Sequence, residues 1–513
     1  MWRAATFIRT ARNAPCGDDL GRKTWYDPPV RLSFLAAAVA VVLVLLPGIA
    51  GGSQLAPLSV PRELHVVSYY PRDAGWTAMW TKWDPARVAS DLDHAVAVDA
   101  NTVRAIVQPD TFGYPHVSPV YASRLSQFVT LAAARGLHVQ LTLFDWWYSW
   151  YDRRGSQTWA RELLAPYAHD ARIAFIELRN EILPKQETTA WATEMIPFVR
   201  RLVPGTPLTL SVAGPNLLGK LATLKRQLGA VRPDFYDIHY FGLGGESAFA
   251  TFARAKQIVA PTPLWVGETG YPTLVNGSGF GGVPRTRAGQ EVAQTQFLST
   301  VAWAAHANGL APIGVWQLGD LDPDAVPDRL VDPEEPELHY GLFRADGSAK
   351  PAAETVRSIF GGSVPTSFNN GFEDSLDGVP ARWEMAGDGI WFAVDHSVAA
   401  TGAASGEIAG AGTASYSIVP PNGGVRSGTR ISASVFARRA APGGSVSIVL
   451  EWHDRAGRLL GRETSPPLAA VGAWSQLAAS GTAPRKGAYV RIDLVAHGLT
   501  APVWFDDVVF SRS

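Results

Sequence analysis

Short apolar runs alternate with longer amphipathic stretches between residues 64 and 360. The short runs have the length and β-branched content of buried strands, whereas the longer stretches repeat apolar residues every three or four positions, as amphipathic helices do. The pattern predicts strands at Leu64–Tyr70, Thr102–Val107, His138–Phe144, Ile173–Leu178, Pro207–Val212, Phe235–Tyr240, Pro263–Gly267 and Pro312–Leu318. It predicts helices at Pro85–Val98, Val120–Arg135, Thr188–Leu202, Asn216–Leu228 and Gly289–Ala307, among others.

This alternation favours a closed (β/α)8 TIM barrel over an open doubly wound sheet. Eight strand–helix units are the number that a barrel needs, and the region 64–362 has the length that such a barrel usually takes. An open nucleotide-binding sheet usually carries a Gly-rich phosphate loop after its first strand, and none follows Tyr70. We therefore predict an α/β barrel over residues 64–362.

The periodicity changes after Gly361 and Gly362. From residue 363 to 513 apolar residues alternate with polar ones, and Gly and Pro interrupt the runs. This period of two is typical of strands with one buried face, and it predicts an all-β jelly-roll sandwich. The clearest runs are Ile431, Ala433, Val435; Val446, Ile448, Leu450; and Val490, Ile492, Leu494.

An apolar segment precedes the barrel. Residues 32–50 carry no charge and are long enough to cross a bilayer, while the preceding residues 1–31 are basic and residues 51–63 form a linker. The positive-inside rule keeps the basic end in the cytoplasm and exports the remainder. The segment is a retained transmembrane signal anchor or a cleaved signal peptide, and both alternatives stay open. We expect the barrel outside the cell or at its surface.

Composition narrows the choice of partners. The chain of 513 residues has a net charge of −1 and contains 18 Trp. A nearly neutral, aromatic-rich chain argues against nucleic acid and suits a neutral ligand such as a sugar. The single cysteine, Cys16, precedes the apolar segment, so the exported part has no disulfides. We expect a monomer.

Polar and aromatic side chains follow the predicted strands, at the end of a barrel where active sites lie. Glu181 follows the fourth strand and Glu268 ends the seventh, so the two carboxylates face each other across the ring. Two carboxyl groups about 5 Å apart are the arrangement of retaining glycoside hydrolysis, in which one protonates the leaving oxygen and the other attacks the sugar.

These motifs resemble the clan A glycoside hydrolases, and most closely the cellulase-like family 5 group. The resemblance covers residues 64–362 and rests on the joint order of several short motifs. They are Asn101-Thr102-Val103-Arg104, Arg179-Asn180-Glu181, His239-Tyr240, Gly267-Glu268, Trp316 and the closing run Tyr340–Lys350.

The resemblance implies a role for each matching residue. Glu181 would be the acid/base and Glu268 the nucleophile, Asn180 would bind the sugar 2-hydroxyl, and Arg104 and Tyr240 would keep Glu268 ionised. Glu181 would then hold its proton near neutral pH while Glu268 stays charged. No catalytic cofactor is implied.

Other residues near these strand ends have two readings each. His239 is a substrate contact or a packed residue, and Asp145 is a substrate ligand or the cap of the next helix. Of the aromatic cluster after strands one and three, we expect about half to be packing; Trp146 and Trp316 are the best candidates to stack on sugar. The acidic, proline-rich loop 320–339 is a solvated surface loop or a wall across one end of the cleft.

The C-terminal region is similar to galactose-binding-like jelly-roll modules, many of which bind carbohydrate. The resemblance rests on Asn369–Glu373 at its start and Val503–Val508 at its end. It implies a structural calcium ion held by Glu373 with Asp506 or Asp507, ligands that suit Ca²⁺. Trp391 and Trp452 are candidates for a sugar platform, whereas Trp383 and Trp474 are expected in the core.

The leading hypothesis is a retaining O-glycoside hydrolase acting on a β-linked oligosaccharide or polysaccharide. Two alternatives are a non-catalytic glycan-binding protein on a hydrolase-like barrel and a transglycosylase with the same carboxylates. Both Glu181 and Glu268 are present, which favours an enzyme over an inactive binder. The choice of glycan, and of endo or exo action, depends on loops that the sequence does not place.

Overall fold

The structure, a computed structural model, describes residues 55–513 with internal gaps. The gaps are 243–247, 275–286, 326–335, 364–368, 374, 377, 381–382, 388–389, 421–422 and 455–456. The predicted membrane or signal segment and the basic region before it therefore lie outside the described residues. Within the described ranges, no helix combines the length and apolar character that crossing a membrane requires.

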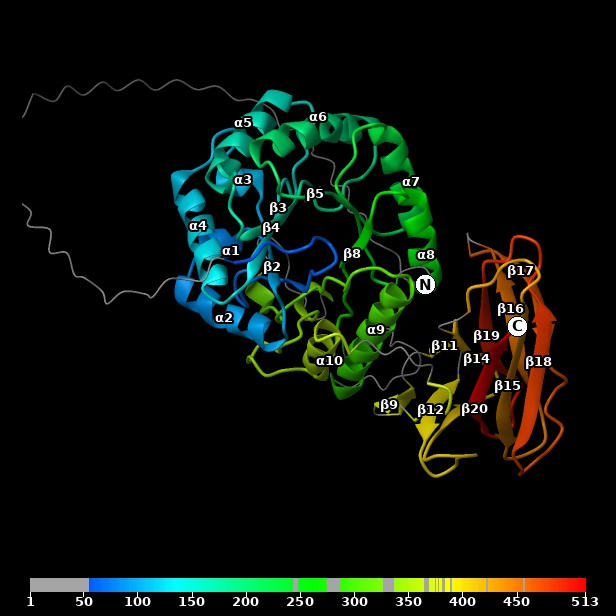
Figure 1. Ribbon diagram of the computed structural model, residues 1–513. Coiled ribbons are helices and arrows are strands. Elements are labelled where there is room, and N and C mark those ends of the chain that lie inside the picture. The colour runs from blue at the N-terminus through cyan, green and yellow to red at the C-terminus, as the bar shows by residue number, and fades with distance from the viewer. Residues whose placement is uncertain are drawn as a thin grey trace, which may run out of the picture. The chain divides into compact units, whose positions relative to one another are not determined.

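The first part of the described chain is a closed parallel barrel (Figure 1). Every pairing between its neighbouring strands is parallel, from β1 with β2 to β7 with β8. The fifth predicted strand is interrupted at Leu210, which separates a five-stranded sheet from a three-stranded one. The strands are β1 (Val66–Ser68), β2 (Thr102–Ile106), β3 (His138–Thr142), β4 (Ile173–Glu177), β5 (Leu208–Thr209), β6 (Ser211–Val212), β7 (Tyr236–His239) and β8 (Leu264–Glu268).

The ring is closed by a segment that is not a regular strand. Val315, inside the predicted strand Pro312–Leu318, forms parallel bridges to Val67 on one side and Thr269 on the other. A side chain at Gly314 would overlap the carbonyl oxygen of Gly267, so this glycine permits the close approach of the two segments. The barrel prediction is confirmed by this closure, although the eighth strand is reduced to bridges.

The helices form the outer ring of the barrel in Figure 1. The five helices that we predicted are found with ends shifted by up to two residues, because periodicity locates a helix better than its ends. Asp84 caps α2, since its side chain accepts hydrogen bonds from the N–H groups of Ala86 and Arg87. The helices are α1 (Ala78–Thr81), α2 (Pro85–Ala97), α3 (Pro109–Phe112), α4 (Pro119–Ala133), α5 (Arg153–Leu164), α6 (Gln186–Leu202), α7 (Leu217–Leu228), α8 (Ala248–Val259), α9 (Arg287–Ala307) and α10 (Pro351–Phe360).

An apolar cluster fills the barrel at the N-terminal ends of its strands. Trp265 is fully buried between the rings of Phe175 and Phe235, at centroid distances of 5.5 and 6.1 Å. Leu58 and Val60, from the segment before β1, pack against this cluster. The N-terminal end of the barrel is thus sealed by hydrophobic packing, and polar chemistry is left to the other end.

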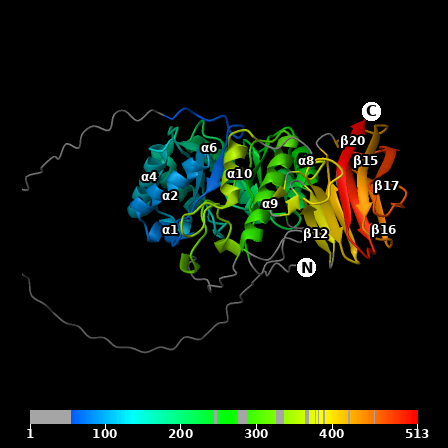
Figure 2. The same cartoon turned by 90° about the horizontal axis from the view of Figure 1, so that it is seen from below.

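The C-terminal part is a sandwich of two five-stranded antiparallel sheets, as predicted. Their orders are β11-β14-β19-β16-β17 and β12-β13-β20-β15-β18, and a hairpin of β9 and β10 precedes them. Figure 2 shows the long strands β15, β16 and β20 from the side. The strands are β9 (Ser375–Leu376), β10 (Val379–Pro380), β11 (Glu384–Gly387), β12 (Trp391–Asp395), β13 (Ser405–Ala409), β14 (Thr413–Ile418), β15 (Arg430–Arg439), β16 (Ser445–His453), β17 (Leu459–Thr464), β18 (Ser475–Thr482), β19 (Tyr489–His497) and β20 (Val503–Arg512).

The proposed platform of Trp391 and Trp452 does not form. Trp391 is 54% exposed, but Trp452 is 2% exposed and packs in the sandwich core with Trp383. Trp452 lies among the alternating inward residues of β16, which explains its burial. Trp383 is in the core as predicted, whereas Trp474 is only half-buried.

Candidate active site

The two predicted catalytic carboxylates lie at the C-terminal end of the barrel. Glu181 follows β4 in a left-handed backbone conformation, with φ of 47°, and its N–H donates to the hydroxyl of Ser211 at 2.8 Å. Glu268 is the last residue of β8. The side chain of Glu181 is 43% exposed and that of Glu268 is 8% exposed, so a ligand has far easier access to Glu181.

His239, at the end of β7, joins the two carboxylates. Its Nδ1 lies 3.0 Å from an oxygen of Glu181 and 3.4 Å from an oxygen of Glu268. One oxygen of each carboxylate and a nitrogen of the ring all lie within 4.8 Å of one another. His239 therefore contacts both carboxylates of the predicted catalytic pair, whereas the sequence left open whether it was merely packed.

Arg104 organises the same site from β2, as predicted. Its fully buried guanidinium donates through Nη1 to Glu268 and through Nη2 to the Asn180 side-chain oxygen at 2.8 Å. The same Nη2 donates to Glu177 at 2.8 Å. The guanidinium of Arg104 thus holds Glu268, Asn180 and the more deeply buried carboxylate of Glu177.

Glu177 and Asp237 form a buried acidic layer beneath the catalytic pair. Glu177 is fully buried and accepts hydrogen bonds from Thr142 at 2.8 Å and Ser211 at 2.5 Å. Asp237 accepts from the N–H of Gly267 at 2.8 Å, directly before Glu268. Neither residue was among our predicted site residues. The sequence did contain a signal for both. Glu177 precedes Glu181, and Asp237 precedes His239, by an even number of residues, so each is expected on the inward face of its strand.

The pKa directions of Glu181 and Glu268 are the reverse of our expectation for the predicted catalytic pair. Burial raises the pKa of Glu268 above its ordinary value, although His239 and Arg104 oppose this effect. Burial also acts to raise the pKa of Glu181, but the hydrogen bond and positive charge of His239 outweigh it and lower this pKa. The expectation left out two features: the contact between His239 and Glu181, and the burial of Glu268.

The other two acid–base groups of the site are shifted as well. Burial acts to lower the pKa of His239, but the carboxylates of Glu268 and Glu181 raise it to about 9. Burial raises the pKa of Asp237 to about 8, against the opposing charge of His239. Near neutral pH His239 is therefore cationic and Asp237 holds a proton.

Asp145 supports two neighbours in the loop after β4. Its carboxylate accepts from Arg179 at 3.3 Å and from the side-chain amide of Asn180 at 3.1 Å. It does not cap the next helix, because Asp152 is the N-cap of α5. Asp145 thereby orients Asn180, and its direct contact with a substrate stays a prediction.

Four aromatic residues line the mouth of the barrel. Trp76 stacks near Tyr70 at a centroid distance of 5.0 Å and near Trp146 at 6.2 Å, and it meets Trp316 edge-on at 6.3 Å. Trp146 is 38% exposed, whereas Trp316 is 6% exposed and donates from its ring nitrogen to Glu337 at 3.2 Å. The two predicted stacking residues therefore belong to one aromatic group, held together by Trp76.

Two further predictions at the mouth are only partly described. The backbone N–H of Tyr240 donates to the carbonyl of Glu268 at 2.8 Å, and its ring packs edge-on against Phe252. Much of the acidic loop 320–339 lies outside the described residues, but Glu337 reaches Trp316. That contact shows that the end of this loop approaches the mouth.

A cavity of about 400 Å³ adjoins Glu181. It is lined by residues after β3 and β4, namely Asp145, Trp146, Tyr148, Trp150, Arg179, Asn180, Glu181, Leu183, Lys185, Glu187 and Thr188. Glu268 is not among them, so this cavity adjoins Glu181 but not the predicted nucleophile. Its size suits one or two sugar rings.

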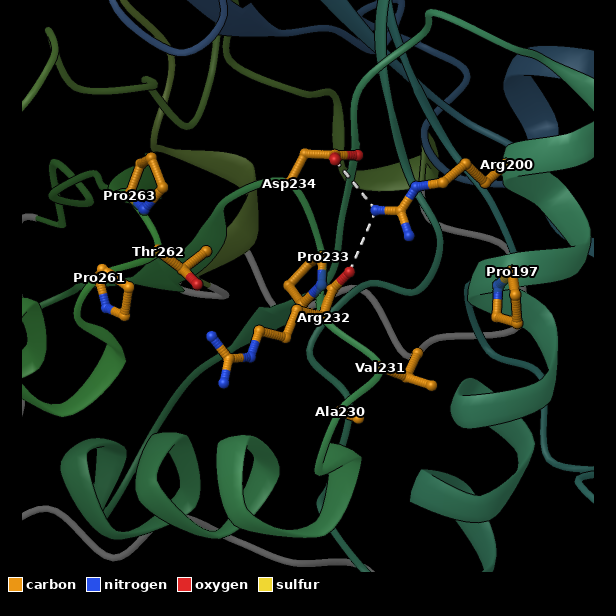
Figure 3. A pocket seen from close by; sticks show the side chains of 10 residues that line it. All are labelled: Pro197, Arg200, Ala230, Val231, Arg232, Pro233, Asp234, Pro261, Thr262 and Pro263. Atoms are coloured by element: carbon orange, nitrogen blue, oxygen red, sulfur yellow. Dashed lines mark hydrogen bonds and ion pairs between the residues drawn. The ribbon is translucent and has the colours of Figure 1, made fainter.

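A second cavity lies outside this site. Figure 3 shows it between the C-terminal half of α6 and the loops that enter β7 and β8, at the end of the barrel opposite the carboxylates. Arg200 donates there to Asp234 at 3.0 Å and to the carbonyl of Arg232 at 3.1 Å. Prolines form much of its wall, and this surface contains none of the predicted site residues.

Residues in the barrel and in the sandwich bear on metal binding. Glu181, His239 and Glu268 are close enough to share a cation, but the charge of Arg104 beside Glu268 disfavours one there. In the sandwich, Glu373 accepts from the N–H of Ala403 at 2.9 Å, and Asp506 accepts from that of Ala400 at 2.6 Å. These carboxylates thus already face backbone donors, and the calcium site stays a prediction.

Comparison with known proteins finds similarity in solved structures only. No protein-family model and no curated protein matches the chain. A GH5_18 protein from Streptomyces cattleya, in complex with GlcNAc, is 20% identical over 59% of this chain and 82% of its own, with a TM-score of 0.47. An exo-β-1,4-mannosidase from Opitutaceae bacterium strain TAV5 is 18% identical over 58% of this chain and 59% of its own, with a TM-score of 0.46.

A third solved structure belongs to a different glycosidase group. It is a GH2 β-galacturonidase from Eisenbergiella tayi bound to galacturonate, 14% identical over 58% of this chain and 51% of its own, with a TM-score of 0.44. At these identities and TM-scores the similarities carry no weight for function. We therefore derive the function of this chain from the residues of its own site.

Proposed function

We propose that the chain is a retaining O-glycoside hydrolase that cleaves β-linked glycans. The observation that supports this most is the approach of Glu181 and Glu268 to within 4.8 Å across the barrel mouth, with one histidine nitrogen between them. Retaining enzymes hold their two carboxyl groups about 5–5.5 Å apart, whereas inverting enzymes need about 6.5–9.5 Å to admit water.

In the first step Glu268 attacks the anomeric carbon while Glu181 protonates the departing oxygen. The bond from the sugar to the leaving group breaks, and an ester to Glu268 forms. In the second step Glu181 removes a proton from water, water attacks the same carbon and the ester breaks. Arg104 holds Glu268 in place, and Asn180 is oriented for the sugar by Arg104 and Asp145.

The shifted pKa values give His239 a role in this proposal. The pKa of Glu268 is raised and that of Glu181 is lowered, yet the proposed first step requires a proton on Glu181. A bound sugar would cover the exposed side chain of Glu181 and raise its pKa. Because Nδ1 of His239 lies within 3.4 Å of both carboxylates, it is suitably placed to pass the proton between them.

The decisive experiment uses both carboxylate variants. Wild type should release the retained anomer from p-nitrophenyl β-glycosides, as followed by NMR. Glu268→Gly should be inactive until azide is added and should then form the inverted glycosyl azide, whereas Glu181→Gly should form the retained azide. Glu354→Gln on exposed α10 is the control and should behave like wild type. Release of the inverted anomer by wild type would contradict the proposed retaining mechanism.

Transglycosylation is a second candidate, favoured by the cavity beside Glu181. A sugar that occupies this cavity could replace water in the second step and give its hydroxyl proton to Glu181. Adding free monosaccharides to the assay should then divert product from hydrolysis to transfer. Equal hydrolysis at every acceptor concentration would remove this candidate.

We also propose the localisation, oligomeric state and substrate class of the protein. We expect export through residues 32–50, a monomeric chain, and an oligosaccharide or polysaccharide substrate. Among the described residues of the sandwich, Trp391 is exposed and suited to sugar, and the calcium ligands Glu373 and Asp506 are proposed without change.

A further inference from the structure

Tyr70 carries a buried hydroxyl that the proposed mechanism does not use. The residue is 3% exposed, and its hydroxyl has no hydrogen-bond partner among the described residues. A buried polar group without a partner costs about 1–3 kcal/mol, so such groups are rare in folded proteins. The adjacent Tyr69 differs: it is equally buried, but its hydroxyl donates to Asp91 at 2.8 Å.

The alternation of side chains along the extended chain explains why Tyr69 and Tyr70 have different surroundings. Ser68, the last residue of β1, pairs in register with Arg104, whose side chain lies in the site. Because side chains alternate along an extended chain, Tyr70 continues the side of Ser68 and Tyr69 lies on the opposite one. Tyr70 thus enters the barrel mouth, while Tyr69 contacts α2 through Asp91.

Tyr70 lies beside residues of the predicted site. Its ring meets Trp316 edge-on at 5.8 Å and stacks near Trp76 at 5.0 Å. Burial raises its pKa well above the ordinary value, the carboxylates of Asp145 and Glu268 act in the same direction, and Arg104 opposes them. The phenol is therefore neutral, and the charges of Glu268 and Arg104 both act on it. It is also absent from the lining of the cavity beside Glu181.

We infer that Tyr70 is a specificity-determining residue whose hydroxyl binds a hydroxyl group of the sugar that becomes attached to Glu268. This inference rests on the proposed hydrolase function. A phenol hydroxyl can donate one hydrogen bond and accept others, so a sugar hydroxyl would satisfy it. A site built to bind a hydroxyl strongly rejects the analogue that lacks it, because the buried partner is then left alone.

The test compares Tyr70→Phe with the matched control Tyr69→Phe. The substrates are the p-nitrophenyl β-glycoside that wild type cleaves fastest and its monodeoxy analogues at carbons 3, 4 and 6. We expect wild type to discriminate against one analogue, and Tyr70→Phe to lose about 10- to 100-fold in kcat/KM on the parent sugar but nothing on that analogue. Tyr69→Phe should keep the wild-type discrimination.

Two further readouts separate recognition from a structural role. Tyr70→Phe should unfold at the same temperature as wild type or higher, because it removes an unpaired group, whereas Tyr69→Phe should unfold at a lower temperature. The loss caused by Tyr70→Phe should be equal for p-nitrophenyl and 4-methylumbelliferyl leaving groups, since the proposed contact is to the glycosyl group and not to the leaving group. A uniform loss on all deoxy analogues, or unchanged kinetics, would overturn the inference.

A binding assay distinguishes failure of the hydrolase proposal from failure of the inference about Tyr70. If wild type cleaves no glycoside, the same compounds are titrated against the fluorescence of the intact chain, since Trp76 and Trp316 flank Tyr70. Weaker binding of one deoxy analogue to wild type, abolished in Tyr70→Phe, would still support the inference without catalysis. Binding that is identical in both proteins, or no binding at all, would overturn it.

Discussion

The two ends of the barrel use the same strands for opposite purposes. At the N-terminal end, Trp265 is packed between aromatic rings and its ring nitrogen donates to Pro312 at 2.7 Å. At the C-terminal end, the hydroxyl of Tyr70, one nitrogen of His239 and one oxygen of Asp237 are buried without hydrogen-bond partners in the described part of the chain. The N-terminal end is thus held by aromatic packing, while the predicted site residues lie at the C-terminal end.

This contrast matches the general division of labour in barrels, in which the C-terminal face reacts and the N-terminal face stabilises. It also leads to opposite expectations for substitutions at the two ends. A change at the N-terminal end should reduce stability and leave the catalytic rate of the folded protein intact. A change at the C-terminal end should reduce the rate and leave stability intact or improved.

The largest expected effect is on activity at the C-terminal end. Glu268→Gln removes the proposed nucleophile while keeping its shape, and kcat should fall by about 1,000-fold or more. Thermal unfolding should not shift downward, because a buried carboxyl with a raised pKa is replaced by a neutral amide. Steady-state kinetics and calorimetry on the same sample measure both. A large loss of stability with normal activity in Glu268→Gln would contradict the assignment of chemistry to the C-terminal end of the barrel.

The largest expected effect on stability is at the N-terminal end. Trp265→Ala should lower the free energy of unfolding by about 3–5 kcal/mol, since it leaves a cavity in a closely packed cluster. At temperatures where the variant is folded, kcat/KM should equal that of wild type. Denaturant titration gives the first quantity, and Trp265→Phe, which keeps most of the volume, should cost much less. A loss of activity in the fully folded variant would contradict this separation.

An intermediate effect is expected from Asp237→Asn. Its carboxyl has a pKa raised to about 8, so the folded state retains a proton that the unfolded state loses above about pH 4. The stabilising contribution is therefore complete below pH 4 and is lost as pH rises towards 8. The neutral variant should be more stable than wild type at pH 7, by on the order of 2–4 kcal/mol. Equal stability at every pH would show that Asp237 is not shifted.

The smallest effect concerns the pH dependence of wild type. The nucleophile must be ionised, and the pKa of Glu268 is raised above 4.5, so the acid limb of kcat/KM should lie above that pH. His239 has a pKa of about 9, and activity should fall as pH rises through this value if its positive charge is required. An acid limb at or below pH 4.5 would contradict the arrangement described for the ligand-free site.

The sequence alone predicted the barrel and the sandwich, and it named the two carboxylates that the structure brings together. Helical and strand periods are local, so they identified most of the elements between residues 64 and 360. The pairing of Glu181 with Glu268 was also predictable, because parallel strands of a closed ring bring their C-terminal ends to one face. The irregular eighth segment was not, because its shape depends on the close approach of Gly314 to Gly267.

The tertiary structure alone decided the state of the site. The contact with His239 lowers the pKa of Glu181, whereas burial raises that of Glu268, so both directions differ from the expectation. Glu181 and His239 are 58 residues apart in the chain, and only the fold brings them together. The different surroundings of Tyr69 and Tyr70, and the burial of Trp452, likewise depend on which neighbours the fold supplies. Residue type and spacing determine what chemistry a side chain offers, but its charge and its partners are set by three-dimensional distances and burial.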